Sequence, residues 1–279
     1  MIPKWPAPGG KARMDHYALH GGGQVATALL ACARLGLRAK FLGKVGDDAG
    51  GRQALQGLSH EGVDVSGVRV VAGASTQTAV ILVDAAAGER AVIWNHDPRL
   101  VLDDVAAEEV GGARALHVDV TGVSGSLAAL RAARAAGMLT SIDIDHVPDR
   151  VDELLTLIDL CVMAEEFPHA LTGEKDRERA LRGVRKWCPQ GTLVVTLGVE
   201  GAMALDGDRV LHVPAFAVKA VDTTACGDVF RGAFLYATLA GWDLERRLRF
   251  ANAAAALKTR KLGAQPGVPT LAEVEAFLR

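Results

Sequence analysis

The 279-residue chain is long enough for one large α/β domain and too short for two ordinary enzyme domains with a linker. Hydrophobic residues make up 49% of it and charged residues 23%, which is a globular composition and excludes an intrinsically disordered chain. Its formal net charge of -2 gives no general attraction for nucleic acids or anionic membranes, so we expect neither as a partner.

The cysteines and the opening of the chain predict a cytoplasmic protein. None of the four cysteines belongs to a C-x-x-C pair, which suits free thiols in a reducing compartment. The opening has no apolar leader segment, and no run of 18 apolar residues follows it. The sequence contains no HExxH motif or close Cys/His pairing, so we expect any metal ion to arrive with a substrate.

The N-terminal third predicts helices and strands followed by a hairpin. The expected elements are a strand at 12–20, a helix at 25–35, a strand at 38–46, a helix at 49–62, and strands at 76–84 and 90–96. The last two strands alternate in polarity and flank a short turn at 85–89. They therefore predict a hairpin that stands apart from the main sheet.

From residue 115 onward strands alternate with helices, which is the pattern of a mostly parallel sheet with helices on its faces. The expected strand regions are 115–120, 139–145, 160–164, 192–198 and 201–216, and the expected helices between them are 126–137, 151–159 and 177–188. Two Ala-rich helices between 228 and 261, broken near Gly241, and a short helix at 271–278 complete the chain.

Residues 221–234, VDTTACGDVFRGAF, form a predicted strand-to-helix turn crowded with small side chains. Ala225, Cys226 and Gly227 would let an anion approach the backbone N–H groups at the start of the helix, where the helix dipole adds partial positive charge. Asp228 either caps that helix or accepts the proton of a hydroxyl that attacks a phosphoryl group. We favour the second interpretation because of the neighbouring anion hole.

This turn and its helix resemble the second signature of the ribokinase-like, PfkB-type carbohydrate kinase family, usually written DTxGAGD. Residues 21–51 are similar to the first family signature, a glycine pair before a small-residue helix and a strand that ends in G-x-D. Residues 194–205 and 251–270 resemble the nucleotide-side segments. The resemblance implies an α/β ribokinase-like fold, with a mostly parallel central sheet flanked by helices and a small β lid from about 14–20 and 76–96.

The resemblance also implies roles for individual residues. Asp228 would be the catalytic base and would contact the substrate, and Ala225, Cys226 and Gly227 would form the anion hole. The nucleotide-binding residues would be Thr196, Gly198, Gly201, Thr223 and Asn252, and the sugar would face Gly22, Gly23 and Gln24. Taken singly, Thr196 is an ordinary strand residue, the two glycines suit a turn, and Asn252 suits a cap or a bridge between helices.

The sequence departs from the family pattern in four places. The family's first core strand, which carries an Asp for sugar hydroxyls, has no counterpart at the N-terminus. Ala225 replaces a usual glycine, which costs on the order of 1 kcal/mol if the position needs a positive φ. Thr27 replaces a frequent Asn. Finally, Ala164 and Phe167 occupy the ends of the usual N-x-x-E motif, which leaves Glu165 and Glu166 as the candidate carboxylates for Mg²⁺.

We therefore predict one kinase domain over residues 1–279 that uses ATP and Mg²⁺ to phosphorylate a hydroxymethyl group of a sugar or sugar-like substrate. Its exposed hairpin predicts a homodimer through the lid. Two alternatives stay open. One is a catalytically impaired kinase-like protein that binds sugar or nucleotide. The other is an NAD-dependent enzyme, since Gly21, Gly23 and Ala26 fit the dinucleotide pattern G-x-G-x-x-A.

Overall fold

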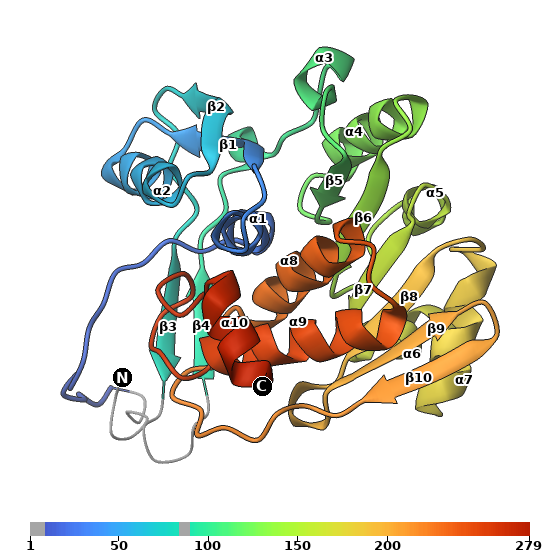
Figure 1. Ribbon diagram of the computed structural model, residues 1–279. Helices are drawn as coiled ribbons and strands as arrows, with labels where there is room; N and C mark the ends of the chain where they lie inside the picture. The colour runs from blue at the N-terminus through green and yellow to red at the C-terminus, as the bar shows by residue number, and fades with distance from the viewer. Residues whose placement is uncertain (1–8, 84–89) are drawn as a thin grey trace.

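The computed structural model describes residues 9–83 and 90–279, and a six-stranded sheet is its centre (Figure 1). Its strands, in spatial order, are β10 (Arg209–Val213), β9 (Ala202–Asp206), β8 (Thr192–Thr196), β7 (Leu160–Ala164), β6 (Leu139–Ile144) and β5 (Ala115–Val118). The pairs from β5 to β8 are parallel, whereas β9 and β10 are antiparallel to their neighbours. The predicted mostly parallel sheet is therefore confirmed.

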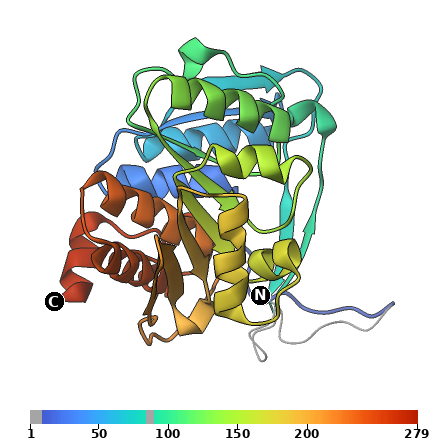
Figure 2. The same ribbon diagram turned by 90° about the vertical axis from the view of Figure 1, so that its right-hand side faces the viewer.

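Helices pack on both faces of this sheet because the side chains of each buried strand alternate between the two faces. On β7, Leu160 and Val162 join the core formed with α1, α8 and α9, whereas Cys161 and Met163 join the core formed with α4, α5 and α7. Figure 2 shows the strands between these two layers. The helices are α1 (Gln24–Arg34), α8 (Cys226–Leu239) and α9 (Leu244–Lys258) on one face, and α4 (Val123–Ala135), α5 (Val151–Thr156), α6 (Glu166–Thr172) and α7 (Arg177–Gly183) on the other.

A second, two-stranded sheet is not hydrogen-bonded to the first. It consists of the parallel strands β1 (Lys40–Gly46) and β2 (Asp64–Val71), connected by α2 (Ala49–His60). The sequence did not predict β2, because Gly67 and Arg69 interrupt its apolar pattern and much of the strand is exposed. The remaining elements are α3 (Ala107–Val110), α10 (Leu271–Leu278) and the 3-10 turns η1 (Pro98–Leu100), η2 (Val184–Lys186) and η3 (Gly198–Glu200).

The expected hairpin is present as β3 (Ala79–Val83) paired antiparallel with β4 (Arg90–Trp94), and these two strands form a third sheet. The expected turn at 85–89 and the chain start at 1–8, where the family's first strand would begin, lie outside the described residues. Among the described residues no helix is both long and apolar enough to cross a membrane.

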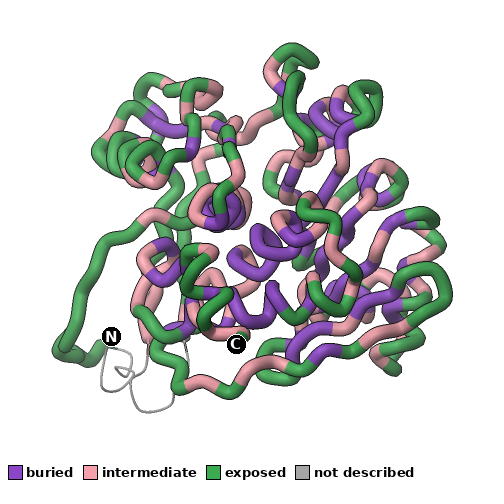
Figure 3. Tube along the Cα trace, viewed as in Figure 1, coloured by how far each residue is buried: buried purple, intermediate pink, exposed green. Residues whose placement is uncertain are grey.

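The prediction of a strand at 12–20 is wrong. Residues 9–20 pair with no strand, and the side chains of Met14, Tyr17 and Leu19 are more than half exposed. Figure 3 shows this segment as an exposed trace. Its apolar residues have the spacing of a strand, but a strand without a hydrogen-bonded neighbour gains too little to persist.

Candidate active site

The turn before α8 is fixed by Asp222. Its Oδ1 accepts a hydrogen bond from the Thr224 N–H at 2.8 Å, and its Oδ2 accepts one from the Gly263 N–H at 2.8 Å. Its backbone oxygen accepts a hydrogen bond from the fully buried Lys258 Nζ at 2.9 Å. These contacts tie the turn to the end of α9, so the start of α8 has one fixed orientation.

Ala225 occupies the left-handed region, with φ 62° and ψ 13°. From the sequence we expected a cost at Ala225 only if the position needs a positive φ, and the structure shows that it does. The Cβ of Ala225 therefore costs on the order of 1 kcal/mol there. Ala225 is also the N-cap of α8 and supplies no side-chain cap. The start of α8 therefore keeps the character of an anion-binding helix end.

Asp228 lies in the first turn of α8 and is partly buried. Burial raises the pKa of this carboxyl to about 6, Arg231 opposes that rise, and the charges of Asp119 and Asp145 add to it. A carboxylate with such a pKa is mostly ionised at neutral pH but far more basic than an exposed aspartate. It therefore fits the requirement for a general base.

A buried ion pair lies beneath Asp228. Arg231 Nε is 2.7 Å from Asp143 Oδ1, with the two side chains 6% and 0% exposed. Burial raises the pKa of Asp143, and the guanidinium of Arg231 opposes that rise. A Cβ on Gly227 would lie 2.4 Å from Arg231 Nη1, so a larger residue there would force the guanidinium to shift. The Arg231–Asp143 pair therefore influences the turn through the charge of Arg231, which acts on Asp228, and through the space that the guanidinium fills beside Gly227.

The predicted sugar-facing residues 22–24 open α1. Gly23 has φ 94° and precedes Gln24, whose Nε2 donates a hydrogen bond to Asp145 Oδ2 at 3.1 Å. Asp145 directly follows β6, and Asp119 directly follows β5. Our sequence analysis missed both carboxylates. The signal was a polar residue just past a buried parallel strand, since ligands bind at that edge of α/β sheets.

The predicted nucleotide-side residues gather around the chain that leaves β10. Thr196 ends β8, and its Oγ1 donates a hydrogen bond to the Met163 oxygen at 3.3 Å. Gly198 and Gly201 have φ of 56° and 100°, so both need the freedom of glycine. A Cβ on Gly201 would also lie 2.2 Å from the Val213 oxygen. The structure thus brings these three residues to the carboxyl edge of the sheet.

Asn252 is buried on α9 and bridges to the segment that follows strand β10. Its Nδ2 donates hydrogen bonds to the backbone oxygens of Val213, at 2.9 Å, and Pro214, at 3.2 Å. The sequence left open a cap or a bridge between helices, whereas Asn252 bridges α9 to the end of strand β10. Asn252 therefore positions the strand exit with its amide nitrogen, while Thr223 is exposed on the turn before α8.

Of the candidate metal ligands, Glu165 forms an ion pair with Arg177, which also pairs with Glu200 at 3.0 Å. Glu166 is exposed at the start of α6. Within residues 9–83 and 90–279, no group of three or more His, Cys, Asp or Glu side chains is arranged to hold a metal ion. Glu165 and Glu166 therefore stay candidate ligands by the sequence pattern alone.

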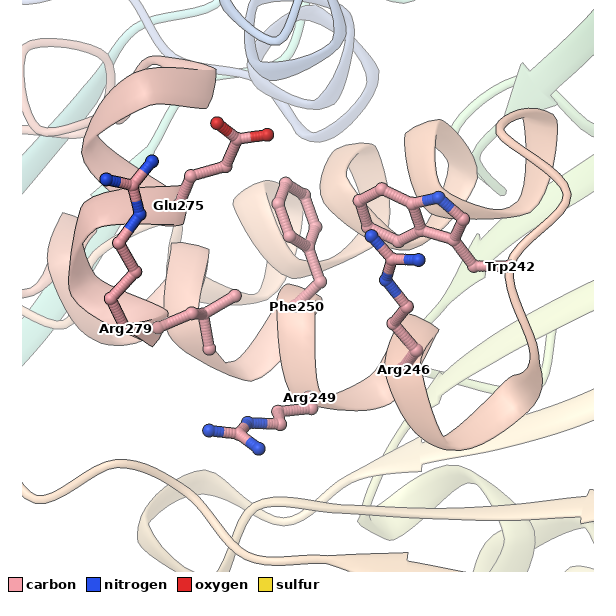
Figure 4. Close-up of a pocket in the computed structure, with 7 residues that line it drawn as sticks. Trp242, Arg246, Arg249, Phe250, Glu275 and Arg279 are labelled. Atoms are coloured by element: carbon pink, nitrogen blue, oxygen red, sulfur yellow. The ribbon is translucent and has the colours of Figure 1, made fainter.

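A pocket of about 450 Å³ lies elsewhere, between α9 and α10 (Figure 4). Arginines and aromatic rings line it, with Arg246 stacked 3.8 Å above the centre of the Trp242 ring. None of the predicted site residues lines this pocket. Asp228 is near the start of the 14-residue helix α8 and Trp242 lies past its end, roughly 20 Å away. The pocket is thus separate from the candidate site.

The dinucleotide alternative is wrong. Gly21, Gly23 and Ala26 do open α1, but residues 9–20 before them form no strand. A dinucleotide fingerprint needs that strand, because the glycine loop must join it to the helix within one βαβ unit.

Comparison with known proteins gives the family. Residues 3–271 match the pfkB family carbohydrate kinases. The chain is 30% identical to a ribokinase from Haemophilus influenzae, over 99% of this chain and 93% of that protein. It is 33% identical to fructokinase-1 from Zea mays (91% and 86%) and 32% identical to an ATP-dependent ribose-1-phosphate kinase from Halopiger xanaduensis (99% and 93%).

Solved structures agree with the sequence matches. A protein from Agrobacterium tumefaciens that is proposed to be a ribokinase aligns with a TM-score of 0.92, at 32% identity, over 99% of this chain and 92% of that one. The Arabidopsis thaliana ribokinase complexed with ribose and ATP aligns with a TM-score of 0.86, at 26% identity, over 99% and 93%. The fold is that of the ribokinases, and the protein belongs to the PfkB family of carbohydrate kinases.

Proposed function

We propose that this carbohydrate kinase transfers the γ-phosphoryl group of MgATP to a hydroxymethyl group of a sugar, with Asp228 as the general base. The observation that carries this proposal is the partly buried carboxylate of Asp228, with its raised pKa, in the first turn of a helix that has no side-chain cap. A base of this kind takes the hydroxyl proton as the oxygen attacks phosphorus.

The residues of the turn divide the remaining work. Backbone N–H groups of Ala225, Cys226 and Gly227 would stabilise the charge that develops on the transferred phosphoryl group. The Cys226 N–H donates to the Thr223 oxygen at 3.3 Å, so it would exchange this long hydrogen bond for one to the phosphoryl group. Thr196, Gly198 and Gly201, with Thr223 and the segment braced by Asn252, would bound the nucleotide, and residues 22–24 would face the sugar. A Mg²⁺ ion that arrives with the nucleotide would supply further charge neutralisation.

The hairpin β3–β4 would close over the sugar and pair with a second copy of the chain. It stands as a separate two-stranded sheet, and Val80, Ile93 and Trp94 on it are more than half exposed. Two strands alone bury little apolar surface, so a lid shared by two subunits gains stability. The free cysteines Cys32, Cys161 and Cys188 are buried, which fits the proposed cytoplasmic location.

The test measures ADP release from MgATP with ketoses, aldoses and nucleosides, for the chain and for Asp228→Asn. We expect turnover with at least one acceptor and a loss of about 10²–10⁴-fold or more in kcat for the variant. Melting temperatures within a few degrees of each other would show that both proteins are folded. Equal rates would remove Asp228 as the base. Acceptor binding without ADP release would favour the impaired, ligand-binding alternative.

A further inference from the structure

Three carboxylates converge where the proposed sugar would lie. Asp119 follows β5, Asp145 follows β6, and Asp228 opens α8. Their charges act on one another: Asp145 adds to the raised pKa of Asp119, and both add to the raised pKa of Asp228. The hydrogen bond from Gln24 to Asp145 joins this group to the start of α1, which is the predicted sugar-facing segment.

The cations of the surrounding elements offset the charge of these three carboxylates only in part. On α8, Arg231 is already paired with Asp143, and on α9 the Lys258 Nζ lies 4.0 Å from the carboxylate Oδ2 of Asp222. Burial lowers the pKa of His117 on β5 to about 3, so that imidazole is neutral. His146 is exposed and lies 2.6 Å from Asp145. The acceptor side of the site therefore carries net negative charge.

We propose that this carboxylate group selects an uncharged, hydroxyl-rich acceptor and rejects sugar phosphates and sugar acids. This inference rests on the proposed kinase function. Sugar hydroxyls are donors that match carboxylate oxygens, whereas an anionic group on the acceptor would repel Asp119, Asp145 and Asp228 in a partly buried space. One of the relatives is named for a phosphorylated acceptor, so the distinction separates this chain within its own family.

The experiment compares acceptors that differ in charge but keep a primary hydroxyl. Equilibrium binding in the presence of a non-hydrolysable ATP analogue and Mg²⁺ is measured for ribose against ribose 1-phosphate, and for glucosamine and glucose against gluconate. We expect each anionic compound to bind at least about tenfold more weakly than its neutral partner, and glucosamine to bind no more weakly than glucose. The amine of glucosamine adds a positive charge, so this comparison tests whether the charge or the size of a substituent determines the affinity.

Variants assign the effect to the carboxylates. Asp119→Asn and Asp145→Asn keep the side-chain shape but remove a charge. Each should therefore reduce the ratio of the binding constant of the neutral acceptor to that of the anionic acceptor by about threefold or more. The control is Asp208→Asn, because Asp208 is exposed on the β9–β10 turn, and β9 runs antiparallel to β8, away from the candidate site. It should leave the ratio unchanged.

The outcomes are separable. Equal binding of neutral and anionic acceptors, or an unchanged ratio in both site variants, would overturn the selectivity while leaving kinase activity intact. If no sugar of any charge binds and none is phosphorylated, the acceptor site itself fails and the proposed function fails with it. Circular dichroism and melting temperature of each variant distinguish these results from loss of folding.

Discussion

The turn before α8 and the β3–β4 hairpin are the two segments to which we assign the catalytic and the lid role, and they are built in contrasting ways. The turn is held by buried groups: Asp222 bonded to two backbone N–H groups, Lys258 beneath it, and the Arg231–Asp143 pair. The hairpin is a separate pair of strands with Val80, Ile93 and Trp94 largely exposed.

This difference indicates a division of labour. In the proposed arrangement, groups that must keep a fixed charge and position relative to the phosphoryl group are in the turn, which buried neighbours hold and whose carboxyl pKa values they determine. In the same arrangement, the groups that would meet the variable part of the substrate, or a second subunit, are in the exposed hairpin, where a change disturbs few contacts. Substitutions should therefore have large effects in the turn and small ones in the hairpin.

The largest effect should come from Gly227→Ala. The added Cβ would meet Arg231 Nη1 at 2.4 Å, and the guanidinium cannot move freely because Asp143 holds it. We expect a loss of about 1–3 kcal/mol in unfolding free energy and a large fall in kcat. Chemical denaturation and ADP release measure the two effects.

Gly57→Ala is the matched control, because Gly57 lies within α2 and its Cβ would meet nothing closer than 3.8 Å. Alanine is a better helix former than glycine, so this variant should be equal or higher in stability. A tolerated Gly227→Ala would show that the Arg231–Asp143 pair does not constrain the turn.

The second prediction concerns pH. Asp228 acts as a base only when ionised, so kcat/KM should fall as the pH drops below about 6, the pKa to which burial raises this carboxyl. Arg231 lowers that pKa, so Arg231→Met should move the acid limb to higher pH by about one unit. The pH–rate profile of each protein gives the measurement.

Arg231→Lys keeps a positive charge and should hold the acid limb near its original position, even if the rate falls. An acid limb that stays in place in Arg231→Met would mean that the guanidinium only fills space. Such a result would remove the electrostatic part of the contrast between the turn and the hairpin.

The third prediction is a gain. Ala225→Gly relieves the positive φ of 62° and should raise the unfolding free energy by up to about 1 kcal/mol, less the added entropy of the unfolded chain. Differential scanning calorimetry measures this change. We expect activity to be equal or higher, and a marked loss of stability would show that the turn depends on the methyl group of Ala225.

The sequence predicted local elements of the fold and the site, but not the long-range contacts that hold them. Regular alternation of apolar strands and helices predicted β5–β8, and one predicted strand region at 201–216 holds both β9 and β10. The compact motif around Asp228 predicted the turn. The pairing of Asp143 with Arg231 joins residues far apart in the chain, and no local pattern encodes it. The strand predicted at 12–20 failed for the same reason, because pairing partners decide whether an extended segment becomes a strand.

The smallest effect should come from Trp94→Ala in the hairpin. Trp94 is 60% exposed, and its ring meets His96 edge-on at 6.1 Å, so its removal opens no cavity and should change the unfolding free energy of the subunit by less than about 0.5 kcal/mol. If the hairpin covers the sugar, KM for the acceptor should rise severalfold while kcat and the KM for ATP stay nearly constant. If the hairpin instead serves only as a subunit contact, sedimentation velocity should show a weakened dimer. The KM for the acceptor should then be unchanged at protein concentrations high enough to keep the variant dimeric. A fall in kcat alone would contradict both roles. It would mean that Trp94 acts on the chemical step, which the division of labour assigns to the turn before α8.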